Sequence, residues 1–195
     1  MGERRDVVRN RARIVAAAEA VFREHGAAVP LDRVAERAGV GRGTIYRHFP
    51  DRAALIAAVY AVRVDALEAY AAGLPPDRLL EHLVVEIAAL QADAPGLFTA
   101  VRAAHGTTPG VAEVEHRATA LLEVALAEAH RRGRVREGVT VDDVRLVFAM
   151  VEGVLAVEDP ERARASVRRA LAVTLHGLLL GPPDDLPEPG LVLPS

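Results

Sequence analysis

With 195 residues and a formal net charge of −3, the chain is long enough for one large domain or two small ones. It contains no cysteine, which excludes disulfides, thiolate metal sites and a cysteine nucleophile. We expect a cytoplasmic protein with no membrane partner, because the N-terminus has no apolar signal segment and no apolar run is long enough to span a bilayer.

The charge is unevenly divided along the chain. Residues 1–60 hold 11 arginines and 7 acidic residues, a net charge of +4, whereas residues 61–195 hold 13 arginines and 20 acidic residues, a net charge of −7. This division favours the N-terminal part as the surface that faces phosphate. Alanine is the commonest residue and aromatic residues are few. We therefore predict an all-α fold of about nine helices.

The N-terminal segment combines basic and apolar residues. Residues 1–8, which carry two arginines, are expected to form a mobile arm that either rests on DNA phosphates or lies free in solvent. The first helix is predicted from Val8 to His25, with Gly26 ending it. Its buried face consists of apolar residues at helical spacing: Ile14, Ala17, Ala18, Val21 and Phe22.

The segment from Leu31 to Arg52 predicts two short helices joined at a glycine. Apolar residues recur at the i, i+3, i+4 and i+7 positions of the first: Leu31, Val34, Ala35 and Ala38. Gly39 follows at the place where a left-handed residue ends a helix. The second helix carries Ile45 and Phe49 on one face. This is the pattern of a helix-turn-helix, whose second helix lies in the DNA major groove.

The second helix leaves donors and aromatic side chains off its apolar face. They suit phosphates and base edges, and they are Arg42, Thr44, Tyr46, Arg47 and His48. Arg42 is the candidate for a base contact, with a phosphate salt bridge as the alternative, and Arg47 either reads a base or is solvated. Gly41 and Gly43 flank Arg42, so the backbone there can approach DNA closely.

The stretch from Ile14 to Tyr60 resembles the N-terminal DNA-binding domain of the TetR family of bacterial transcriptional regulators. The matching residues are Ile14, Ala17, Ala18, Phe22, Gly26, Val34, Ala35, Ala38, Gly39, Val40, Gly43, Thr44, Ile45, Tyr46, His48, Phe49 and Leu55. The resemblance implies that Thr44 and Tyr46 contact the DNA backbone or thymine methyl groups. It implies phosphate contacts for His48 and for Arg52, which stands where the family commonly has lysine.

The sequence departs from the family at Val29 and Pro30, where the family commonly has threonine or serine. Proline suits the first position of a helix, so a helix can begin here. The hydroxyl groups that would cap the helix and contact a phosphate are missing, however. The cap must therefore come from elsewhere in the chain.

The domain organisation follows from these elements. Residues 1–52 are predicted to form the arm and the helix-turn-helix DNA-binding domain, with a helix over 52–72 as the connector. Residues 73–180 are predicted to form a helical ligand-binding and dimerisation domain. The proline-rich tail, residues 181–195, is predicted to be disordered.

The helix predicted over Val141–Val157 is apolar nearly all round and needs cover on more than one side. It is either a central core helix or a dimer face. The resemblance favours the dimer, because the TetR family pairs its final two helices into a four-helix bundle. The predicted interface residues are Phe148, Val151, Val154, Leu155, Leu171, Leu175 and Leu178.

The chain offers little for catalysis. Glu113 and His116 have the spacing of half a di-iron site, but such a site needs a second pair, which the chain lacks. Only two serines occur, and neither lies in a nucleophile motif. We expect no enzyme activity, no catalytic residue, no metal and no cofactor. The candidates for a small-molecule pocket are Phe98, Arg102, His105 and Met150.

By resemblance, the chain is expected to be a TetR-like transcriptional regulator. The expected function is that of a ligand-released repressor, which binds a palindromic double-stranded DNA operator as a homodimer and responds to a largely apolar small-molecule effector. The alternative is a helical ligand-binding or scaffold protein with a vestigial helix-turn-helix. The contrast between the basic N-terminal part and the acidic remainder argues against this alternative.

Overall fold

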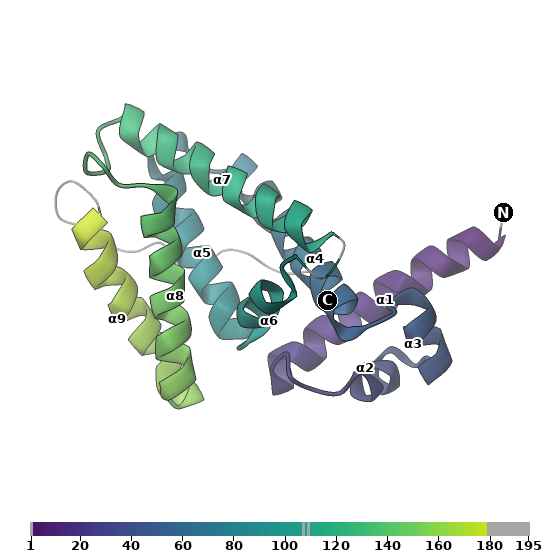
Figure 1. Cartoon of the computed structure of the whole chain (residues 1–195). Helices are drawn as coiled ribbons and strands as arrows, with labels where there is room; N and C mark the ends of the chain where they lie inside the picture. The colour runs from purple at the N-terminus through teal and green to yellow at the C-terminus, as the bar shows by residue number, and fades with distance from the viewer. Residues whose placement is uncertain (1, 107, 109, 179–195) are drawn as a thin grey trace. The chain divides into compact units, whose positions relative to one another are not determined.

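The chain is helical throughout the part that the structure describes. The computed structural model describes residues 2–106, 108 and 110–178, and these residues form nine α-helices, one short 3-10 helix and no strand (Figure 1). This confirms the predicted all-α class. The elements in chain order are α1 (Gly2–His25), α2 (Leu31–Ala38), α3 (Arg42–His48), α4 (Arg52–Ala72), the 3-10 helix η1 (Pro76–Arg78), α5 (Leu79–Asp93), α6 (Leu97–Ala104), α7 (Val111–Arg131), α8 (Val141–Val157) and α9 (Pro160–Leu178).

The first helix is longer than the sequence predicted. α1 begins at Gly2 rather than at Val8, so the segment expected to be a mobile arm continues the helix. No proline or glycine interrupts the chain between Gly2 and Gly26, and alanine and arginine, both strong helix formers, make up much of it. The predicted disordered tail, residues 181–195, lies outside the described residues.

The chain divides into two compact units. The first, which we call the head, contains the described residues up to Arg63 together with those of Ala94–Val114. The second, the body, contains Val64–Asp93 and the described residues from Glu115 onward. The head therefore includes α6 and the first part of α4, which the sequence assigned to the body domain and to the connector.

The core of the head is built from the apolar faces of its helices. In α1, Ile14, Ala18 and Phe22 lie one turn apart and have no exposed surface, as the periodicity predicts. Ile45 from α3 and Leu55 from α4 are buried to the same extent. The two short helices of the helix-turn-helix are thus held against a core that the longer α1 and α4 supply.

One ion pair lies inside the head. Nε of Arg63 on α4 donates a hydrogen bond of 2.9 Å to Oε1 of Glu19 on α1. The side chains are 1% and 4% exposed, respectively. A buried pair of this kind holds two helices in one register, because separating the charges leaves each of them away from water.

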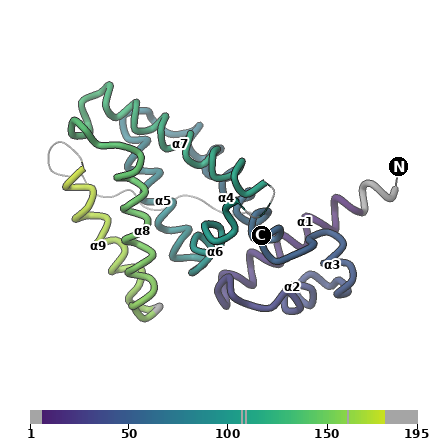
Figure 2. Tube along the Cα trace, viewed as in Figure 1, coloured from purple at the N-terminus to yellow at the C-terminus, as the bar shows by residue number. Residues whose placement is uncertain are grey.

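α5 is the central helix of the body. Its residues Leu83, Val84 and Ala88 have no exposed surface, and the helix packs against both α8 and α9. α8 and α9 lie side by side and are joined by a short connection (Figure 2). The two most apolar helices, α5 and α8, therefore share one core with the apolar face of α9.

α8 begins with a capping box. The Thr140 side chain accepts a hydrogen bond of 3.4 Å from the backbone N–H of Asp143, and the Asp143 carboxylate accepts one of 2.7 Å from the backbone N–H of Thr140. The bond from the Thr140 backbone is the main reason that the pKa of Asp143 is lowered, since it favours the charged carboxylate. The hydrogen bonds between Thr140 and Asp143 therefore fix the residue at which the apolar helix α8 begins.

Arg117 ties α7 to the second part of α4. Its Nε donates a hydrogen bond of 3.1 Å to Oε1 of Glu68, and its Nη2 donates one of 2.6 Å to Oδ1 of Asp65. The bonds to Glu68 and then to Asp65 raise the pKa of Arg117. The group is partly exposed to solvent, so this ion pair contributes orientation more than stability.

No single helix among the described residues is long and apolar enough to cross a bilayer. The η1–α5 segment and α6 reach that length and composition only when they are joined across the break between them.

The buried ion pair generates a prediction about stability. Glu19→Ala removes the carboxylate opposite a fully buried guanidinium, so the free energy of unfolding should fall by about 3–5 kcal/mol. Urea denaturation measures this change. Glu24→Ala on the same helix is the matched control: Glu24 pairs with Arg37 at the exposed surface, so its loss should cost less than about 1 kcal/mol. Equal losses for the two variants would contradict a special role for the buried pair.

Candidate nucleic-acid interface

The turn between α2 and α3 depends on Gly39. This glycine has a φ of +62°, in the left-handed region, and it ends α2 as the sequence predicts. The backbone N–H groups of Gly39 and Val40 donate to the last carbonyl groups of the helix, at 3.1 Å and 3.0 Å. A Cβ at position 39 would also stand 3.3 Å from Nη2 of Arg13. Glycine is therefore required here for its conformation, and a side chain would in addition press on the guanidinium of Arg13.

α3 is anchored by its apolar side and leaves its polar side in solvent. Ile45 on the helix and Phe49 just after it are buried in the head. Of the predicted DNA-binding residues, Arg42, Tyr46 and Arg47 are exposed. The arrangement presents arginines and an aromatic ring on one short helix, which suits phosphates and the edges of bases.

The glycines around Arg42 leave the start of α3 open. Gly43 is exposed, and a Cβ added at Gly41 or Gly43 would meet no atom within 4 Å. Neither glycine is required by packing, and neither has a positive φ. The absence of side chains instead leaves room for a ligand to approach the backbone closely.

Thr44 and His48 differ from the other predicted contact residues because they are half-buried. Nε2 of His48 is buried and has no hydrogen-bond partner among the described residues. A hydrogen bond from His48 to a phosphate would therefore have to come from Nδ1.

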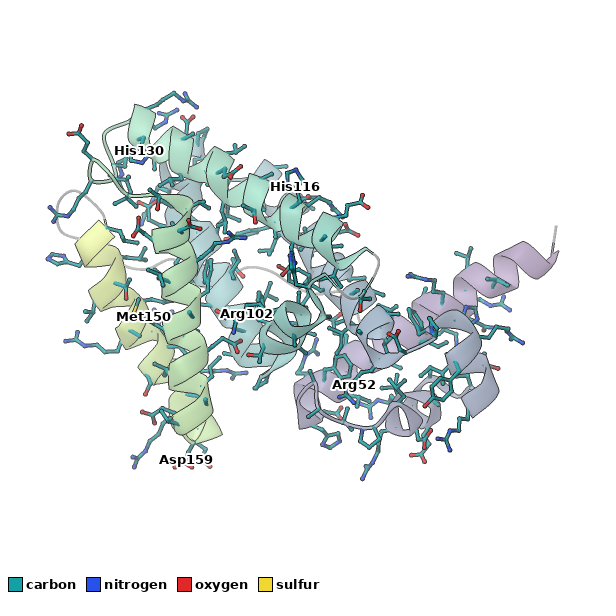
Figure 3. All side chains as sticks on the ribbon, in the orientation of Figure 1. Arg52, Arg102, His116, His130, Met150 and Asp159 are labelled. Atoms are coloured by element: carbon teal, nitrogen blue, oxygen red, sulfur yellow. The ribbon has the colours of Figure 1, made fainter. Side chains whose placement is uncertain are left out.

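The guanidinium of Arg52, at the first residue of α4, faces the chain itself. Its Nη1 donates a hydrogen bond of 2.6 Å to the carbonyl oxygen of Val29, and its Nη2 donates to that of Ala27 (Figure 3). Burial lowers the pKa of Arg52, although a guanidinium stays charged under ordinary conditions. Arg52 thus binds the connection that precedes α2, where Pro30 stands at the N-cap and provides no side-chain cap.

A second arginine holds the other end of α2. Nη2 of Arg13 on α1 donates a hydrogen bond of 2.7 Å to the carbonyl oxygen of Ala38, the last residue of α2. Carbonyl groups at a helix C-terminus lack partners within the helix and carry partial negative charge, so an arginine is well placed there. Sequence reasoning missed this role, because Arg13 stands in a run of arginines with no mark that separates it from its neighbours.

An acidic residue faces the candidate base-reading arginine. Oδ1 of Asp32 on α2 lies 3.3 Å from Nε of Arg42 on α3. The guanidinium carbon of Arg42 also lies 5.9 Å from the centre of the Tyr46 ring. No sequence motif singles out Asp32, and the contact depends on how the two helices cross.

The four predicted ligand-binding residues do not share one compact unit. Phe98 and Arg102 lie on α6 and His105 directly follows it, so these three belong to the head. The ring of Phe98 packs edge-on against Tyr60 of α4, with ring centres 5.6 Å apart. Met150 belongs to the body and is exposed on α8 (Figure 3).

The predicted dimer residues are divided between the interior and the surface of the body. Four of them are buried within the single chain: Phe148, Val151, Leu171 and Leu175. Val154, Leu155 and Leu178 are half-buried. The exposed large apolar residues of the same two helices are Leu146, Met150, Val157 and Val173. The apolar patterns of α8 and α9 contained these positions, but they did not indicate which side of each helix faces the core.

The head thus contains a short exposed helix that follows a left-handed glycine, bears arginines and is anchored by buried apolar residues. These features define a DNA-binding protein of the helix-turn-helix class.

Residues 14–59 match the family described as bacterial regulatory proteins, tetR family. A solved TetR transcriptional regulator from Streptomyces coelicolor is 31% identical to this chain, covers 87% of it and 98% of its own length, and superposes with a TM-score of 0.62. The chain belongs to the TetR family of transcriptional regulators.

Two further comparisons extend the likeness. The solved structure of SmeT, the repressor of the Stenotrophomonas maltophilia multidrug efflux pump SmeDEF, is 25% identical and covers 95% of this chain and 96% of its own, with a TM-score of 0.52. A curated HTH-type transcriptional regulator of Staphylococcus aureus is 42% identical over 53 residues, which is 27% of this chain. That match spans only 29% of the length of the curated relative.

The contacts of Arg52 generate a prediction that separates a structural role from a phosphate contact. Arg52→Ala leaves the carbonyl groups of Ala27 and Val29 without their charged donor, so the free energy of unfolding should fall by about 1.5–3 kcal/mol. Arg52→Lys, with its single ammonium group, should lose about half as much. Thermal or urea denaturation of the purified variants measures both. An unchanged stability together with weaker DNA binding would instead assign Arg52 to phosphate.

Proposed function

We propose that this regulator is a repressor that binds a palindromic operator as a homodimer and is released by a small-molecule effector. The observation that carries the proposal is the surface of α3, where Arg42, Tyr46 and Arg47 are exposed while Ile45 and Phe49 anchor the helix. A helix held in this way can enter the major groove without unpacking the head. This favours a regulator over a helical scaffold whose helix-turn-helix is vestigial.

The residues of α3 are proposed to have different tasks. Arg42 is proposed to read guanine, whose O6 and N7 atoms match the paired donors of a guanidinium. Thr44, Tyr46 and Arg47 are proposed to contact the backbone or neighbouring bases. Gly43 would let the start of the helix come close to a phosphate, because no side chain stands between its backbone and the DNA.

A single head offers one seven-residue helix, which is a small surface for tight binding. Two copies related by a two-fold axis would double the contacts and place the two recognition helices ~34–36 Å apart on successive turns of DNA. The exposed apolar side chains of α8 and α9 support such a pairing, since a body in isolation leaves them in water. The repressor assignment is supported by the likeness to SmeT, which is described as a repressor.

Release by an effector requires that one ligand favour a dimer whose heads no longer match successive major grooves. The proposed effector is largely apolar, because the buried residues of the body are mainly aliphatic, such as Leu83, Val84 and Val147. A coupling of ~1–3 kcal/mol, equivalent to a ~5–150-fold change in operator affinity, is typical of such a switch.

The central test is selection of bound duplexes from random-sequence DNA with the full-length protein. We expect a palindromic sequence to be enriched, with half-sites about one helical turn apart. If the dimer makes roughly eight phosphate contacts, the logarithm of the binding constant should fall with the logarithm of salt concentration with a slope near −7. Failure to enrich any sequence, with no salt-dependent retention on DNA, would support the scaffold alternative.

The proposed pairing through α8 and α9 can be tested with two matched valines. Val173 on α9 and Val124 on α7 are 60% and 62% exposed. Val173→Glu should bury a charge in the proposed interface and give monomers of 20.8 kDa, whereas Val124→Glu should leave the dimer intact. Light scattering measures the mass of each variant. A Val173→Glu protein that remains dimeric while Val124→Glu dissociates would place the interface elsewhere.

A further inference from the structure

We propose that Asp32 is a specificity-determining residue of the DNA-binding surface, although it makes no base contact itself. Its carboxylate holds the guanidinium of Arg42 so that the two Nη groups face a guanine edge rather than a phosphate. This inference rests on the proposed function of Arg42 in base reading, and it adds a residue on α2 that neither the sequence pattern nor the helix-turn-helix arrangement assigns.

Arg42 is held from two sides. The carboxylate of Asp32 lies 3.3 Å from Nε, and the ring of Tyr46, one turn further along α3, lies 5.9 Å from the guanidinium carbon. The side chains of Arg42 and Asp32 are 71% and 52% exposed, respectively. Both groups of the pair are therefore at the surface where DNA would bind, and neither is needed to fill the core.

The nitrogen of Arg42 that pairs with Asp32 determines which N–H donors of the guanidinium remain available to DNA. A guanidinium is planar and has five N–H donors, one on Nε and two on each Nη. Because Oδ1 of Asp32 is paired with Nε, the four Nη donors are left for DNA. Two parallel donors in a fixed plane match O6 and N7 of guanine. A guanidinium held in this plane loses less freedom when it binds than one that moves freely.

The carboxylate of Asp32 also disfavours a contact between Arg42 and a DNA phosphate. Arg42 at the start of α3 could instead pair with a phosphate, which would strengthen binding to every sequence equally. A negative charge beside the guanidinium repels a phosphate from that place, while the neutral edge of guanine is not repelled. Asp32 therefore lowers the affinity for DNA in general and raises the ratio between the correct and the incorrect sequence.

The position of Asp32 at the start of α2 favours a negatively charged side chain. Asp32 lies in the first turn of α2, where the backbone N–H groups lack partners within the helix and favour negative charge. An exposed ion pair contributes little to stability. Loss of the carboxylate should therefore alter DNA discrimination while lowering the thermal unfolding temperature by no more than a few degrees, a combination that a purely structural role would not predict.

The experiment compares Asp32→Asn with Glu36→Gln in the full-length protein. Glu36 lies one turn along the same helix, is exposed, and has no ion pair with Arg42 among the described residues, so both variants remove one negative charge from α2. The probes are the duplex that native protein enriches from random DNA and a scrambled duplex of the same length and composition. Fluorescence anisotropy at fixed salt gives both dissociation constants.

We expect Asp32→Asn to bind the scrambled duplex more tightly and to lower the ratio of the two affinities by about 5–10-fold, within the range of one bidentate base contact. Glu36→Gln should strengthen both complexes and leave the ratio within about twofold, as a general charge effect requires. An unchanged ratio in Asp32→Asn, or an equal fall in both variants, would overturn the proposal.

A double variant identifies the partner of Asp32. Arg42→Ala alone should lower the affinity ratio, and adding Asp32→Asn to it should cause no further fall, because the carboxylate acts only through Arg42. A second fall of similar size would show that Asp32 acts on another group and would overturn the proposal. Failure of the proposed function has a different result: the native protein would then enrich no duplex, and no affinity ratio would exist to change.

Discussion

The orientation of the recognition helix depends on hydrogen bonds that fix α2 at both ends. α3 has only seven residues, too few to be stable as an isolated helix, so its direction comes from the elements it packs against. Arg13 binds the last carbonyl of α2, and Arg52 binds the carbonyl of Val29, just before Pro30. Both arginines come from the long helices of the head. The short helices therefore take their position from α1 and α4 through charged donors as well as through the apolar core.

This arrangement divides the arginines of the head into two groups that the net charge does not distinguish. Arg13 and Arg52 donate to backbone carbonyl oxygens of the chain itself, whereas Arg42 and Arg47 are exposed on α3. The count of 11 arginines against 7 acidic residues indicated a surface for phosphate, yet part of that positive charge is used in folding. The guanidinium groups of Arg13 and Arg52 keep their charge and still attract DNA at long range, but they are not available for direct contacts with phosphate.

The helices and the turn could be predicted because their causes are local. The spacing of Leu31 and Ala38 along one face, and Gly39 after them, depend only on neighbouring residues. The missing hydroxyl caps at Val29 and Pro30 also showed that acceptors for the first N–H groups of α2 had to come from elsewhere. Arg52 does not replace them, because it donates to the carbonyl groups that precede the helix. Which arginine would donate to these carbonyl groups depends on tertiary packing. The same limit applied to α8, whose apolar residues on both sides gave no basis for separating buried from exposed positions.

In the proposed mechanism, α4 is the element through which an effector in the body would act on the head, since it contributes several turns to each unit, whereas α7 contributes only its first turn to the head. The part of α4 in the head and the part in the body are held by ion pairs that differ in their exposure to solvent. Arg63 is joined to Glu19 inside the head, where water cannot replace either partner, while Asp65 and Glu68 meet Arg117 at a partly exposed place in the body. A rearrangement costs less at the second site, because solvent can take over its hydrogen bonds. The head would then move with α4 as a rigid unit while the contact with α7 changes, so a small shift in the body would alter where α3 lies without altering how α3 is built.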